Sequence, residues 1–139
     1  MINFLRPIVS LLLILVVVGC AVVQPSIPRP VSSGNPAVLA LIDRAHSQNA
    51  AGELELAGAS LERALRIEPR NALLWQELAL VRLDQGLYRQ AESLSAKSNG
   101  FAADNRTLRG ENWRIIGQAR SGQGDYRGAQ AAFDWAEQE

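Results

Sequence analysis

The sequence predicts an all-α fold that is built from three similar helical hairpins. Apolar residues recur at helical spacing, as in Leu74, Leu78 and Val81. No run of residues alternates with the period of two that a half-buried strand requires. A glycine recurs between the helical segments, and the chain matches itself when it is shifted by about one hairpin.

The chain begins with a short apolar segment. Residues 8–23 hold no polar side chain besides Ser10 and Cys20, and Arg6 precedes them. As a helix at ~1.5 Å per residue this segment spans ~24 Å, which is less than the ~30 Å hydrocarbon core of a membrane. A positive flank, a short apolar run and an end of small residues are typical of an export signal.

The end of this segment, Val17-Val18-Gly19-Cys20, resembles the lipobox of bacterial lipoproteins. This resemblance implies that residues 1–19 are a signal peptide cleaved after Gly19. It also implies that Cys20 carries a diacylglyceryl group and a further acyl chain such as palmitate, enough to hold the protein stably on a membrane. In this family an Asp directly after the lipidated cysteine favours retention at the inner membrane. Here Ala21 follows Cys20, so the resemblance implies an anchor in the outer membrane and a domain that faces the periplasm. The alternatives are an uncleaved anchor and a signal peptide cut elsewhere.

A proline-rich tether is expected after the lipid, over residues 20–36. Prolines stand at positions 25, 28, 30 and 36, and proline disfavours both helix and central strand. An extended polyproline segment rises ~3.1 Å per residue, so such a tether reaches ~45 Å from the lipid surface. The alternative is that this segment docks into an aromatic groove.

Self-comparison divides the rest of the chain into three units. A shift of 34 residues places Gly52 on Gly86, and a shift of 38 places Gly86 on Gly124. The second shift also places Trp75 on Trp113. The four extra residues amount to about one helical turn, so we expect them to lengthen the helix that begins near residue 106. The predicted repeat domain covers residues 37–139, in units of about 37–71, 72–109 and 110–139.

Each unit carries signals for the two ends of its first helix. Asparagines at positions 35, 71 and 105 are predicted N-caps, because their side chains can accept from free backbone N–H groups. Glycines at positions 52, 86 and 124 are predicted to end the first helices, where a left-handed residue is needed.

The units resemble the tetratricopeptide repeat. The residues that carry the resemblance are Trp75-x-x-Leu78-Ala79, Trp113-x-x-Ile116-Gly117, Gly86-Leu87-Tyr88-x-x-Ala91, Gly124-Asp125-Tyr126-x-x-Ala129-x-x-x-Phe133, and Pro69. The resemblance implies a right-handed superhelical stack, in which the first helices line a concave groove. Small residues such as Ala79 and Ala91 then face each other across each hairpin, and Ser95 stands where a large apolar residue is usual.

The groove is our first candidate binding surface, for an extended or helical peptide of an envelope protein. Apolar side chains make up most of its first two units, and polar side chains make up the third. The residues expected to line it are Leu39, Ile42, His46, Asn49, Leu73, Gln76, Leu80, Leu83, Arg114 and Gln118. The alternative is that its apolar members pack against neighbouring helices.

The C-terminal end is our second candidate surface. Trp135 aligns with Arg63 and Lys97 of the earlier units, so an exposed position has gained a large aromatic ring. We expect Trp135 to contact a partner or a second copy of the chain, which gives a weak homo-oligomer. The alternative is a partly exposed ring that lies along its own helix.

Composition argues against catalysis. The 14 basic residues balance the 14 acidic ones, and nucleic-acid binding requires a basic face. One cysteine and one histidine disfavour a zinc site and a nucleophile pair. We therefore expect a protein that is not an enzyme, binds no metal, and has no cofactor besides the lipid on Cys20.

Two functional hypotheses remain. In the first, the chain is a membrane-anchored adaptor or assembly factor, for example of a pilus or a secretion complex. In the second, it regulates enzymes of cell-wall synthesis or remodelling through its repeat groove. Both are known among lipoproteins that resemble this chain in architecture, and both imply a protein partner in the envelope.

Overall fold

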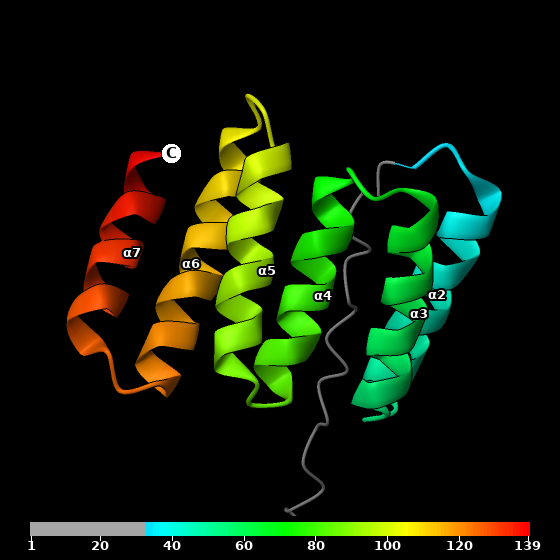
Figure 1. Cartoon of the computed structure of the whole chain (residues 1–139), viewed down its shortest axis with the longest axis horizontal. Coiled ribbons are helices and arrows are strands. Elements are labelled where there is room, and N and C mark those ends of the chain that lie inside the picture. Colours follow the sequence, from blue (N-terminus) through cyan, green and yellow to red (C-terminus); the bar gives the residue numbers. More distant parts are fainter. Residues whose placement is uncertain (1–32) are drawn as a thin grey trace, which may run out of the picture. The chain divides into compact units, whose positions relative to one another are not determined.

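The computed structural model describes residues 33–139, and within that range it contains six α-helices and no strand (Figure 1). The helices are α2 (Pro36–Ala50), α3 (Leu54–Ile67), α4 (Ala72–Asp84), α5 (Tyr88–Phe101), α6 (Arg106–Gly122) and α7 (Tyr126–Gln138). The all-α prediction is confirmed. The signal peptide, Cys20 and the tether up to residue 32 lie outside the described residues. No helix within 33–139 is long and apolar enough to cross a membrane.

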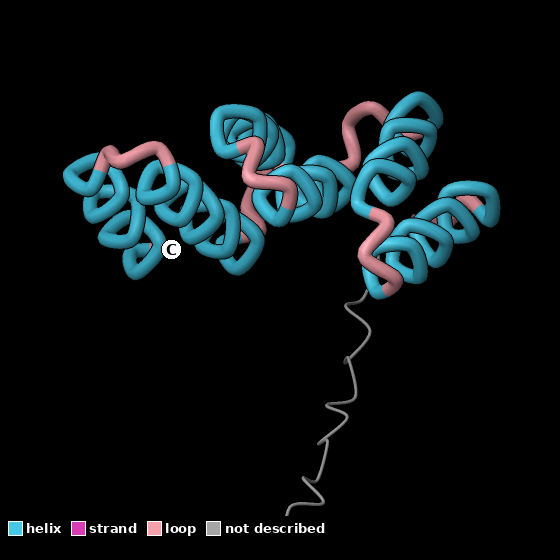
Figure 2. The backbone as a smooth tube through the Cα atoms, turned by 90° about the horizontal axis from the view of Figure 1, so that it is seen from below, coloured by secondary structure: helices cyan, strands magenta, loops and turns pink. Residues whose placement is uncertain are grey.

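The helices form three hairpins, α2–α3, α4–α5 and α6–α7, that follow one another along the array (Figure 2). Each hairpin turns at one of the predicted glycines. Gly52, Gly86 and Gly124 have φ angles of 77°, 73° and 82°. A residue with a Cβ atom is strained in this left-handed region, so the turns require glycine.

The predicted asparagine caps are confirmed at the start of each first helix. The Asn35 side chain accepts from the Ala37 N–H, and the Asn105 side chain accepts from the Leu108 N–H. The Asn71 side chain accepts from two N–H groups at the start of α4. Helix α2 begins at a proline, whose missing N–H costs nothing in the first turn. From the sequence Pro36 is expected in the tether, whereas the structure places it in the first helix.

Helix α6 contains the four inserted residues. It has 17 residues, whereas the equivalent helix α4 has 13. The added turn lies at the start of α6, so the third hairpin begins at Arg106. A whole turn adds length without rotating the buried face away from the core.

Small residues allow the two helices of each hairpin to approach closely. Ala79 and Ala91 are fully buried in the second hairpin. In the third hairpin the equivalent position is Gly117, and a Cβ atom there would lie 2.5 Å from Cε1 of Phe133. No such contact is sterically allowed, so the Phe133 ring occupies the space that an alanine would need.

The buried residues differ along the array. The apolar core cluster is supplied by α2, α3 and α4, and its large members include Ile42, Leu61 and Leu74. The buried side chains between α4, α5 and α6 include four polar ones. These are Gln76, Ser95, Ser98 and Asn112, each at most 1% exposed. Polar residues thus replace part of the core in the second half of the domain.

Candidate partner-binding surfaces

The structure places the predicted groove residues in three environments. Leu39, His46, Asn49, Arg114 and Gln118 are exposed, whereas Leu73, Leu80 and Leu83 are half-buried. Ile42 and Gln76 are each only 1% exposed, so they do not line an accessible surface. Ile42 belongs to the apolar core, and Gln76 points toward α6.

Polar contacts join the first helices of successive hairpins. His46 Nε2 on α2 lies 3.2 Å from Oε2 of Glu77 on α4. Gln76 Nε2 on α4 donates to Oε2 of Glu111 on α6, at 3.1 Å. His46, which stands alone in the sequence, therefore has a partner on the next hairpin. These contacts fix the spacing of α2, α4 and α6.

Trp135 is 53% exposed and stacks on Trp113 of α6. The ring centroids are 6.1 Å apart and the ring planes are inclined by 25°. Offset stacking of this kind is a favourable arrangement of two aromatic rings. The contact holds Trp135 against the neighbouring helix and leaves half of its surface available. The expected contact with a partner or a second copy stays a prediction.

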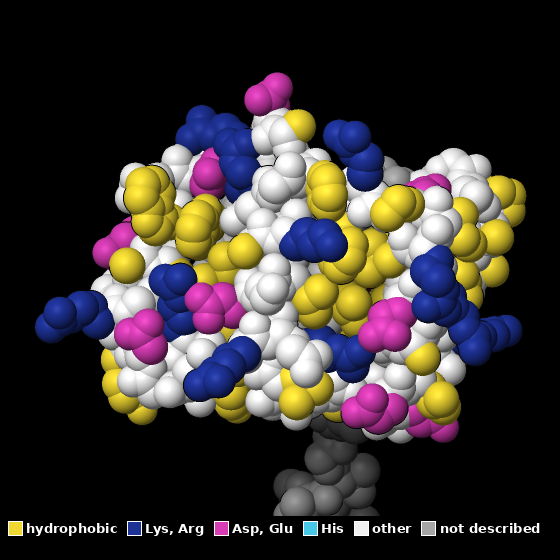
Figure 3. Space-filling model, viewed as in Figure 1, with side chains coloured by type: hydrophobic (Ala, Val, Ile, Leu, Met, Phe, Trp, Pro, Cys, Tyr) yellow, Lys and Arg dark blue, Asp and Glu magenta, His cyan; other side chains and the backbone are white. Residues whose placement is uncertain are grey.

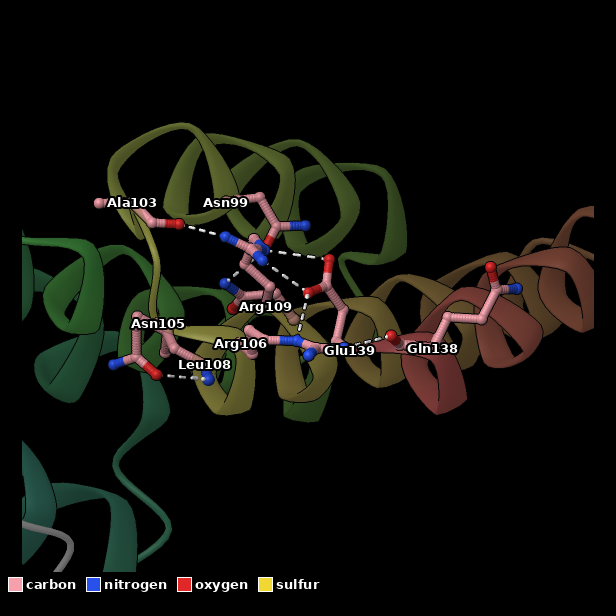
Figure 4. Close-up of polar contacts among 9 residues, drawn as sticks. Asn99, Ala103, Asn105, Arg106, Leu108, Arg109, Gln138 and Glu139 are labelled. Carbon is pink, nitrogen blue, oxygen red and sulfur yellow. Dashed lines mark hydrogen bonds and ion pairs between the residues drawn. The ribbon is translucent and has the colours of Figure 1, made fainter.

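Two arginines in the first turn of α6 contact the C-terminal end of α7 (Figure 4). Arg109 donates from Nη2 and Nε to the two carboxylate oxygens of Glu139, at 2.7 and 3.0 Å. Arg106 donates from Nη2 to the backbone oxygen of Gln138, at 2.8 Å. The hydrogen bond from Arg109 lowers the pKa of Glu139 and raises the pKa of Arg109. Sequence reasoning did not identify this cluster.

A second charged cluster links α5 to α6. Arg120 Nε donates to Oε1 of Glu92 at 2.8 Å, and Gln123 Nε2 donates to Oε2 at 2.9 Å. Burial raises the pKa of Glu92, but the hydrogen bonds from Gln123 and Arg120 and the Arg120 charge outweigh it. The net effect is a lowered pKa. Glu92 therefore stays ionised and holds the two hairpins together.

Two cations lie over aromatic rings near the junction of the first and second hairpins. Lys97 Nζ lies 3.8 Å from the centroid of the Trp75 ring, and Arg70 Cζ lies 5.9 Å from that of Phe101. We call these four residues the cation–aromatic patch. Sequence reasoning missed it. The alignment of the repeats indicated this contact. Lys97 aligns with Trp135, and Trp75 aligns with Trp113. The two tryptophans Trp113 and Trp135 form the stacked pair of the third hairpin.

A hollow of about 350 Å³ adjoins the cation–aromatic patch. It lies where the α3–α4 and α5–α6 connections meet, and it includes Leu73 of the predicted groove. Its lining combines apolar and polar side chains with the guanidinium of Arg70. The lining residues are Arg70, Asn71, Ala72, Leu73, Phe101, Ala102, Asn105 and Leu108.

The described side chains suit non-covalent binding. Among residues 33–139 no group of three or more His, Cys, Asp or Glu side chains could hold a metal ion. Ion pairs and cation–ring contacts account for many of the charged groups and fix their positions. Rigid charges beside apolar rings are features of protein interfaces.

Comparison with solved structures finds a domain that is similar to this chain. No protein-family model matches the chain, and no curated protein matches it. The globular C-terminal domain of LpoP from P. aeruginosa has a similar solved structure, with a TM-score of 0.73. The two sequences are 40% identical, and the match covers 76% of this chain and 99% of that domain. The similarity thus extends over the whole of that domain, in sequence as well as in fold.

Proposed function

We propose that this chain, which belongs to the same family as the LpoP C-terminal domain, regulates enzymes of cell-wall synthesis from the bacterial envelope. The observation that carries the proposal is 40% identity over 99% of that domain. LpoP is an outer-membrane lipoprotein that regulates peptidoglycan synthases. The similarity favours the second of the two sequence-based hypotheses over an assembly role in pili or secretion.

We propose further that lipid on Cys20 anchors the chain at the outer membrane with its helical domain in the periplasm. The lipobox-like sequence and the similarity to LpoP support this placement. Replacing Cys20 by Ala should abolish acyl labelling and leave the precursor uncut by the lipoprotein-specific peptidase. Normal labelling and outer-membrane fractionation of Cys20→Ala would contradict the anchor.

The proposed regulation works through protein contact, without catalysis and without a cofactor besides the lipid. Exposed aromatic, apolar and charged side chains on a rigid array support such a role. Contact with a partner enzyme changes its rate when the contact favours one conformation of that enzyme.

The test uses the full lipoprotein in detergent with the purified peptidoglycan synthases of the same cell. Incorporation of a labelled lipid-linked precursor is measured with and without the lipoprotein. We expect the lipoprotein to increase the rate of at least one synthase, and a heat-unfolded sample to have no effect. Unchanged rates for every synthase would overturn the proposal. A fall in secretin multimers in cells lacking the chain, with normal wall labelling, would restore the assembly hypothesis.

A further inference from the structure

We propose that the cation–aromatic patch, Arg70, Trp75, Lys97 and Phe101, is the docking surface for an acidic segment of a partner protein. The inference rests on the proposed function and names the chemistry of the contact. Figure 3 shows one face of the molecule, on which hydrophobic side chains reach the surface with Lys and Arg side chains beside them.

The charges of the patch are not neutralised by the protein itself. Arg82, Arg109 and Arg120 each lie within 2.6–2.8 Å of a glutamate oxygen. Within the described part of the chain, Lys97 and Arg70 have no carboxylate at ion-pair distance, and each contacts an aromatic ring instead. A ring attracts a cation without neutralising its charge, so the cation can still attract an anion from its open side.

The patch is positioned before any partner arrives. Trp75 Nε1 donates to the backbone oxygen of Pro69 at 2.9 Å, which fixes the indole against the α3–α4 connection. Lys97 and Phe101 lie one turn apart on α5, so one helix presents a cation and a ring side by side. Ordering these side chains costs little on binding, because they are already ordered.

An acidic peptide segment fits this surface better than a uniformly charged polymer does. Two cations complement two carboxylates, and the rings between them offer apolar contact to the neighbouring side chains of such a segment. The adjoining hollow of about 350 Å³, with Leu73 in its lining, has room for one apolar side chain. The chain as a whole carries balanced charge, which disfavours binding to long polyanions.

The experiment uses the full lipoprotein in detergent and two probes. The first is a fluorescent peptide of alternating glutamate and leucine, with a glutamine–leucine peptide as its control. The second is the synthase that responds to the lipoprotein. We expect the glutamate peptide to bind at least ~10-fold more tightly than its control, with an affinity that falls as salt rises.

Charge reversal separates the patch from the rest of the surface. Lys97→Glu and Arg70→Glu should each weaken binding of both probes ~10-fold or more, and Lys97→Arg should retain it, because arginine also stacks on rings. Arg89→Glu is the matched control, since Arg89 is an exposed cation at the other end of α5. It should leave binding unchanged. Helical circular dichroism confirms that each variant is folded.

The outcomes distinguish the patch from the proposed function. Parental binding of both probes by Lys97→Glu and Arg70→Glu would overturn the patch and leave the regulatory function standing. Loss of peptide binding in these variants, with no synthase responding to the parent, would support the patch and overturn the function. Binding to vesicles of anionic lipid but not to the glutamate peptide would assign the patch to lipid and overturn this proposal.

Discussion

The first and second halves of the helical domain are held together by different chemistry. The junction of α2, α3 and α4 is filled by branched apolar side chains such as Val38, Leu61 and Leu74. The junction of α4, α5 and α6 buries amide and hydroxyl groups at comparable depth, including Gln76 and Asn112. The same hairpin plan therefore carries an apolar core in its first half and a core of mixed apolar and polar side chains around α5 and α6.

Only some of the buried polar groups at the junction of α4, α5 and α6 are paired by hydrogen bonds. Ser98 Oγ donates to the backbone oxygen of Ala72, and Asn112 Nδ2 donates to Ser98 Oγ, both at 2.8 Å. Among the described residues, Ser95 Oγ, Gln76 Oε1 and Asn112 Oδ1 are buried without a hydrogen-bond partner. Each such group loses its hydration without replacement, which costs ~1–3 kcal/mol.

This difference teaches that a repeated fold need not be uniformly stable. Apolar burial stabilises a junction in proportion to its area, whereas unpaired buried polar groups oppose it. We therefore expect the second and third hairpins to separate before the first two do. A partner that binds across the array would then act on the junction that we expect to open first.

The largest expected effect lies in the apolar junction. Leu61→Ala removes most of a side chain that is 1% exposed in the structure. Such truncations leave a cavity and typically cost ~2–5 kcal/mol. Urea unfolding followed by circular dichroism measures the loss. A loss below ~1 kcal/mol would mean that this junction is not the stronger of the two.

The next effect concerns a close contact between α6 and α7. Gly117→Ala places a Cβ atom 2.5 Å from the Phe133 ring, so the ring must shift or the two helices must move apart. Overpacking of this kind costs ~1–3 kcal/mol. Gly100→Ala is the matched control, because its Cβ atom would meet nothing within 4 Å. If both variants melt at the parental temperature, α6 and α7 are not closely packed at Gly117.

A smaller effect, of opposite sign at two buried hydroxyls of α5, tests the hydrogen bonding of the polar junction. Ser95→Ala removes a buried hydroxyl that has no partner, so it should raise stability by ~1 kcal/mol. Ser98→Ala removes a hydroxyl that makes two hydrogen bonds, so it should lower stability by a similar amount. The two variants are compared in one urea series. Equal changes of the unfolding free energy in the same direction would show that the hydrogen bonding of these hydroxyls does not determine stability.

The smallest effect is on pH dependence. The hydrogen bond from Arg109 lowers the pKa of Glu139 below its ordinary value of 4.5 in the folded protein. Its stabilising contribution is therefore present above that value and is lost as the pH falls through the lowered pKa. The protection factors of the α7 amides against hydrogen exchange should fall on acidification in the parent, relative to those of α2. Glu139→Gln should remove this dependence; the same acid response in that variant would assign it to another group.

Local sequence signals predicted the helices and their ends. The capping asparagines and turn glycines act through their own backbone neighbours, so no tertiary information was needed at Asn71 or Gly86. The resemblance to the tetratricopeptide repeat also placed Ala79 and Ala91 in a close helix contact. The extra turn of α6 followed from the change of repeat length.

The surfaces were harder to predict because they depend on how hairpins pack against each other. Ile42 and Gln76 lie on the expected helices, but neighbouring helices cover them. Lys97 reaches Trp75 from another helix, and no pattern within α5 alone indicates that contact. Alignment of equivalent positions between units carries such information, since it relates the Lys97–Trp75 and Trp135–Trp113 pairs.

The added turn of α6 contains Arg109, which reaches the end of α7, so the two helices of the third hairpin are joined at both ends. One connection is the covalent turn at Gly124, and the other is the bidentate contact of Arg109 with Glu139. Helix ends usually fray, but Glu139, which follows α7, is held at both of its carboxylate oxygens. Arg109 also donates to the backbone oxygen of Ala103, a non-glycine residue with a φ angle of 47°. Arg109→Ala should therefore expose both α7 and the α5–α6 connection to faster proteolysis than in the parent.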